Sequence, residues 1–187
     1  MDTLYQAFKT RAEAVSAEVH RFATRDEALG FITGFLQAEG VNHTSPNHAA
    51  WADCPFLEGL DRQQLSRQVP GLGFEITREL AAEAKIGISQ MDWAIADTGT
   101  LAQDATPVAR RLVSTLPITH VALIATGALN PDLSSVLKKV DPRQSAYLSF
   151  ITGPSRTADI ERVLTIGVHG PERLIIVFVD ELKGKAV

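Results

Sequence analysis

The chain has 187 residues, of which 45% are hydrophobic, and this fits one globular domain that can bury a substantial core. Its formal net charge of −4 and its lack of a stripe of basic and aromatic residues exclude a nucleic-acid-binding surface. Its single cysteine, Cys54, excludes an intramolecular disulfide and an iron–sulfur cluster held by this chain alone.

The N-terminal 40 residues predict a helical extension. Leu4 and Phe8 begin an apolar stripe at helical spacing, and a second helix is expected to start near Thr24. This segment lacks the apolar core of a signal peptide, and no apolar run in the chain is long enough to span a membrane. We therefore expect a cytoplasmic protein with a single domain over residues 1–187.

Residues 41–71 predict an irregular connection, with a short strand at 49–52 and a helix at 60–69. His43 and His48 lie in a loop of this connection. No third ligand follows them in a recognisable pattern, so we expect no metal site.

Residues 72–187 predict an α/β core. We expect a helix from Thr77 through Ala84, a strand over 91–96, and helices that alternate with later strands. The segments HVALIA, AYLSFI and LIIVFV are continuous apolar runs, which is typical of parallel strands covered on both faces. The fold class is therefore α/β, a three-layer α/β/α sandwich with a mainly parallel sheet.

The stretch TGPSRTADIE at 152–161 carries the strongest chemical signal. It follows a buried strand, and apolar residues at helical spacing come after it, so we expect a tight turn and a helix N-terminus. Ser155 and Thr157 can cap this helix, and free N–H groups at such an end favour an anion. Arg156 adds a forked cation. A plain strand-to-helix turn remains the alternative.

Ligands in an open parallel sheet bind beyond the C-terminal ends of the strands. The turn DTGT at 97–100 follows a predicted strand, as the 152–157 segment does, so we expect both at one small anionic-ligand pocket. An Asx-type turn is the alternative for DTGT. His169 and Gly170 precede the last strand and so begin at the opposite edge. They reach the pocket only if the preceding helix overshoots or a second subunit supplies them.

The motifs IADTGT, TGPSRTADIE and GVHGP, at 95–100, 152–161 and 167–171, together resemble the lactate-utilisation (LUD domain) family, and more closely its lactate utilization protein C type. By this likeness residues 98–100 match the first signature of the family, residues 153–159 its second, and residues 169–170 its third. We call the segments that contain them, residues 97–100, 152–159 and 169–170, the signature loops. The chain departs from the family at Gln90-Met91-Asp92, where smaller residues are expected.

The resemblance implies a fold like that of the sugar-phosphate isomerase and CoA-transferase proteins. It also implies a cluster-free subunit that works with iron–sulfur partner proteins in the oxidation of L-lactate to pyruvate, and it assigns no catalytic residue and no cofactor. The expected ligand is a small carboxylate or a phosphorylated molecule. The predicted ligand-binding residues are Asp97, Thr98, Gly99, Thr100, Gly153, Pro154, Ser155, Arg156, Thr157, Asp159, His169 and Gly170.

Two other functions stay open at this point. One is a stand-alone enzyme of the same fold that acts on a phosphorylated or CoA-linked metabolite. The other is an interaction module that docks through its first helix. The sequence also leaves open whether the chain forms a homo-oligomer.

Overall fold

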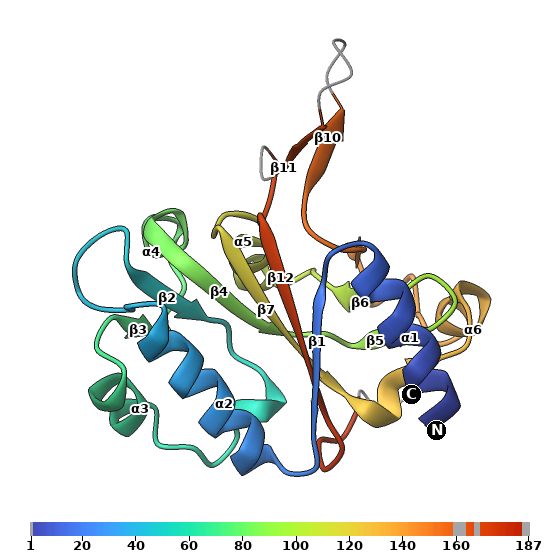
Figure 1. Cartoon of the computed structure of the whole chain (residues 1–187), viewed down its shortest axis with the longest axis horizontal. Coiled ribbons are helices and arrows are strands. Elements are labelled where there is room, and N and C mark those ends of the chain that lie inside the picture. Colours follow the sequence, from blue (N-terminus) through green and yellow to red (C-terminus); the bar gives the residue numbers. More distant parts are fainter. Residues whose placement is uncertain (1, 159–163, 167–168, 185–187) are drawn as a thin grey trace.

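The computed structural model describes residues 2–158, 164–166 and 169–184 (Figure 1). It has the α/β architecture expected from the sequence, with helices on both faces of a mainly parallel sheet. A smaller mixed sheet and a short hairpin complete the fold. No helix in these ranges combines the length and the apolar character needed to cross a membrane.

Six parallel strands form the main sheet, in the order β1-β12-β7-β4-β2-β3. The central strands β12, β7 and β4 are buried along almost their whole length, which explains their continuous apolar runs. Because all six run in one direction, their carboxyl ends share one edge, called here the C-terminal edge. The strands are β1 Glu18–Phe22, β2 His48–Trp51, β3 Leu72–Gly73, β4 Ala84–Gln90, β7 Thr119–Ala125 and β12 Arg173–Val179.

Alternate side chains of the central strands face different layers. Ile175 and Val177 of β12 join one apolar cluster with α2 and α3, whereas Ile176 and Phe178 join a second cluster with α1. The ring of Phe178 meets that of Phe8 edge-on, with centroids 5.1 Å apart. The helices are α1 Asp2–Ala14, α2 Arg25–Ala38, α3 Arg62–Gln68, α4 Arg78–Glu83, α5 Val108–Thr115 and α6 Leu133–Leu137, with 3₁₀ turns η1 Pro55–Leu57 and η2 Thr126–Ala128.

The second sheet lies beside α1 and has the strand order β8-β5-β6-β9. The chain leaves β4 and enters β5 after two residues, so this sheet continues from the C-terminal edge of the main sheet. β5 and β6 pair as an antiparallel hairpin, and β9 runs antiparallel to β6. β9 comes from the AYLSFI run and is only partly buried, so the prediction of a buried parallel strand there is wrong. The strands are β5 Trp93–Ile95, β6 Thr100–Asp104, β8 Leu129–Asn130 and β9 Leu148–Ile151.

Strand β1 corrects the expectation that residues 1–40 are helical throughout. α1 ends at Ala14, and Ser16 turns the chain with a positive φ of 71°. β1 then pairs in parallel with β12 and buries Val19. The N-terminal segment therefore contributes an edge strand to the main sheet.

Strand β4 corrects a second expectation. Thr77 caps α4 as predicted, but the helix ends at Glu83 and Ala84 already begins β4. Gly87, three residues beyond the expected helix, lies inside this strand, and a Cβ there would come within 1.9 Å of Val113 O. The glycine therefore lets α5 lie directly on the central strand.

A hairpin replaces the start of the helix that we expected after residue 155. Strand β10, Arg156–Ala158, pairs antiparallel with β11, Leu164–Ile166. Figure 1 shows this hairpin extending away from the two sheets. The prediction of a helix N-terminus at Ser155 is wrong, and the rest of the expected helix at 159–163 and 167 lies outside the described residues.

Candidate functional site

Two glycines of the signature loops lie against the end of α1. Gly99 and Gly153 have positive φ values of 66° and 68°, a conformation that favours glycine. A Cβ on Gly99 would come within 2.4 Å of Ala12 N, and one on Gly153 within 2.5 Å of Val15 O. The structure therefore brings these two loops together, but the backbone of α1 and of the residue after it fills the space against them.

The pairing of β6 with β9 explains why the two loops meet. Leu101 lies opposite Ile151 in the antiparallel register, so the residues next to them, Thr100 and Thr152, are also neighbours. Their hydroxyl oxygens are 2.8 Å apart. This hydrogen bond ties the first signature loop to the second.

The third signature loop joins the second one at a different place from the expected pocket. Ser155 N donates to Pro171 O over 2.8 Å, and a Cβ on Gly170 would lie 3.3 Å from the Ser155 Cβ. Pro171 stands just before Arg173, where β12 starts. These contacts lie at the N-terminal edge of the main sheet, whereas we expected the pocket at the C-terminal edge.

Arg156 is engaged with the end of α1. Its Nη2 donates to Val15 O and to Ser16 Oγ, each over 2.8 Å. The carbonyl end of a helix carries partial negative charge, which a guanidinium stabilises. Arg156 thus serves as a cation at a helix C-terminus, while the prediction placed it at a helix N-terminus facing an anion.

The remaining predicted residues are dispersed. Asp97 and Thr98 are exposed, and Asp97 lines a shallow depression of about 580 Å³ beside α1. Pro154 is buried and His169 is exposed. Thr157 is described only as part of the β10 backbone. Asp159 lies outside the described residues.

The C-terminal edge of the main sheet holds a cavity that we did not predict. It has a volume of about 440 Å³ and lies beyond β4, which ends at Gln90. Open parallel sheets bind small molecules at this edge, and the volume falls within the range of small-molecule pockets. The polar residues that line it in the described part of the chain are Gln90, Asp92, Asp104, Arg110 and Lys183. We call it the β4 cavity.

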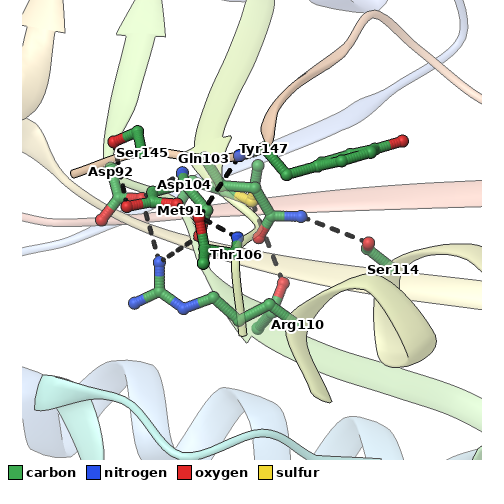
Figure 2. A network of polar contacts seen from close by, with 10 residues as sticks. Met91, Asp92, Gln103, Asp104, Thr106, Arg110, Ser114, Ser145 and Tyr147 are labelled. Atoms are coloured by element: carbon green, nitrogen blue, oxygen red, sulfur yellow. Dashed lines mark hydrogen bonds and ion pairs between the residues drawn. The ribbon is translucent and has the colours of Figure 1, made fainter. Parts of the chain in front are cut away.

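A largely buried ion pair lines the β4 cavity, and Figure 2 shows it within a network of polar contacts. Asp92 Oδ2 accepts from Arg110 Nη1 over 2.9 Å and from Asp104 N over 2.6 Å. The Asp92 side chain is 8% exposed and the Arg110 side chain 17%. Arg110 Nη1 also donates to Asp104 O over 3.1 Å. These bonds link α5 to the β5–β6 hairpin and fix the guanidinium in place.

Asp104 is held by the loops around it. Its Oδ1 accepts from Thr106 Oγ1 over 2.6 Å, and its Oδ2 accepts from Ser145 Oγ over 3.0 Å. Figure 2 shows these side chains and Arg110 converging on the end of β6. The carboxylate of Asp104 therefore has a fixed position in the cavity wall.

Gln90 lines the β4 cavity and is 6% exposed. Its Oε1 accepts from Phe56 N over 2.9 Å, which fixes the orientation of the amide. Within the described ranges no hydrogen bond uses Gln90 Nε2, so this nitrogen keeps its donors for a ligand. One feature of the sequence pointed to this cavity. The segment Gln90-Met91-Asp92, which departs from the family pattern before the first signature, contains two of its lining residues.

Metal and thiol chemistry find little support in the described part of the chain. No group of three or more His, Cys, Asp or Glu side chains there is arranged to hold a metal ion. Cys54 is buried, and burial raises the pKa of its thiol, which disfavours the nucleophilic thiolate.

Comparison with known proteins identifies relatives of the chain. The LUD domain family matches residues 5–179. The protein named lactate utilization protein C of an Exiguobacterium species is 40% identical over 114 residues, which are 58% of this chain and 50% of that protein. The protein of the same name in Halalkalibacterium halodurans is 36% identical over 109 residues, 55% of this chain and 47% of that protein. The chain thus spans about half the length of these curated relatives.

A solved structure supports the fold. A DUF162 family protein from Deinococcus radiodurans superposes with a TM-score of 0.64 at 16% identity, covering 95% of this chain and 97% of that one. At this identity the likeness concerns the fold alone.

Proposed function

The chain belongs to the LUD domain family, and from this premise we propose that it serves in lactate utilisation, as a subunit that works with iron–sulfur proteins in the oxidation of L-lactate to pyruvate. Relatives with 32–40% identity carry the name lactate utilization protein C. The proposal transfers that role to this chain.

The need for a redox partner follows from the chemistry. Oxidation of a 2-hydroxy acid to a 2-oxo acid releases two electrons, which need an acceptor. An iron–sulfur cluster is held by several thiolates, and this sequence contains one cysteine. We therefore assign the clusters to partner proteins.

One structural observation carries the role of this chain as a ligand-binding subunit. The β4 cavity lies at the edge where open parallel sheets bind small molecules, and the cations Arg110 and Lys183 line it. A guanidinium and an ammonium are the groups that bind a carboxylate through charge-assisted hydrogen bonds. We propose this cavity as the place where a small anion binds.

Anion binding by the signature loops stays a prediction. In the structure Nη2 of Arg156 donates to Val15 O and Ser16 Oγ, which holds the guanidinium at the end of α1. The β4 cavity combines the fixed guanidinium of Arg110 with the ammonium of Lys183 around one volume, and we favour it as the binding place.

A deletion strain tests the proposed function. Loss of this chain is expected to abolish growth on L-lactate as sole carbon source, while growth on pyruvate continues. The affinity-tagged chain, returned to the strain, is expected to restore growth and to co-purify with proteins that show iron–sulfur absorption. Growth of the deletion strain on lactate at the normal rate would refute the proposal.

A further inference from the structure

We propose that the β4 cavity is selective for a short hydroxy-monocarboxylate, with the ligand's carboxylate held by Arg110, Lys183 and Gln90 and its hydroxyl donating to Asp92. This inference rests on the proposed function, because it names the ligand of the same chain.

The donors of the cavity are pre-organised for a carboxylate. Arg110 uses Nη1 for Asp92 and for the Asp104 carbonyl, and in the described part of the chain neither Nε nor Nη2 makes a hydrogen bond. Gln90 keeps its Nε2 donors, because its Oε1 is fixed by Phe56 N. Three nitrogen donors on rigid groups match two carboxylate oxygens, with Lys183 at the exposed side.

One carboxylate oxygen of the cavity, Asp92 Oδ1, can accept a hydrogen bond from a ligand hydroxyl. Asp92 is 7% exposed and yet lines the cavity. Its Oδ2 has two donors, while its Oδ1 makes no hydrogen bond with any described residue. A buried carboxylate oxygen is stabilised when it gains a donor, and a ligand hydroxyl supplies one. Asp104 is less available, since Thr106 and Ser145 already donate to both of its oxygens.

The balance of charge limits the ligand to a monoanion. Among the described residues, two carboxylates and two cations line the cavity, so a ligand with one negative charge gives that lining a net charge of only −1. A phosphate dianion or a CoA ester would bring several negative charges beside Asp92 and Asp104 and would meet like-charge repulsion. The cavity therefore disfavours the phosphorylated and CoA-linked ligands that the sequence left open.

Substitution of Gln90 by Glu gives the sharpest test. Gln90→Glu has the same shape and keeps an acceptor for Phe56 N, but it replaces the Nε2 donor with a negative oxygen. Lys183→Ala removes the exposed cation without disturbing the buried pair. Lys138→Ala is the matched control, because Lys138 is an exposed lysine directly after α6 and does not line the cavity.

The measurement is an NMR titration of the full isotope-labelled chain with L-lactate, propionate, pyruvate, inorganic phosphate and CoA. L-lactate is expected to shift resonances around Gln90 and Asp92 and to bind about tenfold or more tightly than propionate, which lacks the hydroxyl. Pyruvate, which has a keto oxygen facing Asp92, is expected to bind more weakly than lactate. Gln90→Glu and Lys183→Ala should each weaken lactate binding by about tenfold, and Lys138→Ala should leave it unchanged.

Three results would overturn the inference. They are equal affinity for propionate and lactate, tighter binding of phosphate or CoA, and full lactate affinity in a folded Gln90→Glu variant. The proposed function has a separate readout, because growth on lactate is measured in cells. If Gln90→Glu restored growth in the deletion strain as well as the native chain does, the binding site would be wrong and the role in lactate utilisation would stand.

Discussion

Gly99 and Gly153 both lie against the end of α1, although they come from different loops. A Cβ on either residue would meet backbone atoms, Ala12 N at 2.4 Å or Val15 O at 2.5 Å. Both residues also have positive φ values. The two signature loops thus form a packing surface, called here the seat, for the end of α1. Close packing in this seat explains why positions 99 and 153 require glycine, and no ligand is needed to explain it.

Replacement of Gly99 or Gly153 by alanine is expected to destabilise the protein by roughly 2–4 kcal/mol. Left-handed backbone strain on a non-glycine residue costs about 1–3 kcal/mol, and displacement of the α1 backbone adds an overpacking cost of similar size. Urea unfolding measures the change in the free energy of unfolding. Gly127→Ala is the control, since nothing lies within 4 Å of its added Cβ. An effect of Gly99→Ala as small as that of the control would contradict the seat.

Arg156→Ala separates the two interpretations of the second signature loop. The variant loses the hydrogen bonds to Val15 O and Ser16 Oγ, so its stability should fall by about 0.5–1.5 kcal/mol, as for ordinary exposed hydrogen bonds. Its affinity for small carboxylates and for phosphate should stay unchanged. Arg143→Ala is the control, because Arg143 is exposed and its side chain makes no hydrogen bond with the described residues. A clear loss of anion affinity in Arg156→Ala alone would place the anion at the signature loops.

Much of the main sheet could be predicted because its strands are buried on both faces. Ile176 and Ile175 face opposite layers of apolar side chains. β12 is therefore apolar at every position from Leu174 to Val179, and a sequence shows such a run directly. The same reasoning located β7. The cap of α4 at Thr77 was visible because a helix start depends on local hydrogen bonding.

The missed elements depend on contacts that the sequence does not show. A glycine such as Gly87 is unfavourable in a strand, so the sequence of β4 predicts a strand only weakly. The glycine is needed because the carbonyl of Val113 in α5, 26 positions further along the chain, lies directly against it. β1 has five residues and one buried side chain, so its hydrophobic pattern is too weak to predict a strand. It becomes a strand through its pairing with β12. The β4 cavity joins Gln90, Arg110 and Lys183 from three separate segments, and only the tertiary fold brings them together.

His120 gives the protein a stability that falls with acidity. It lies inside β7, where complete burial lowers the pKa of the imidazole to about 4, and its Nε2 is 2.9 Å from Ser89 Oγ. The unfolded chain binds a proton at this site near pH 6.5, whereas the folded protein does so only near pH 4. Stability should therefore decrease as the pH falls from about 6.5 toward 4, by on the order of 3 kcal/mol from this residue.

Urea unfolding at several pH values measures this effect. His120→Gln keeps a hydrogen-bonding side chain for Ser89 but cannot titrate, so its stability should depend less on pH between about 6.5 and 4. The imidazole resonances of His120 should also stay constant in NMR spectra down to about pH 5. A resonance that titrates near pH 6.5 would show that the imidazole is hydrated. The remaining acid sensitivity of the variant is assigned to carboxylates such as Glu18, whose pKa is lowered by its hydrogen bond with Arg173.

The ion pair of Asp92 and Arg110 is expected to be strongly coupled. Asp92→Asn or Arg110→Met alone leaves one charge largely buried without its partner, which typically costs about 3–5 kcal/mol. The double variant should cost much less than the sum, because no uncompensated charge remains. The exposed pair of Arg62 and Asp53 is the comparison, with side chains 42% and 77% exposed, and Asp53→Asn should cost less than about 1 kcal/mol. If Asp92→Asn and Asp53→Asn lowered the free energy of unfolding equally, water would have free access to Asp92 and Arg110. The Arg110 guanidinium would then not be held in place, which would contradict its proposed role in binding a carboxylate.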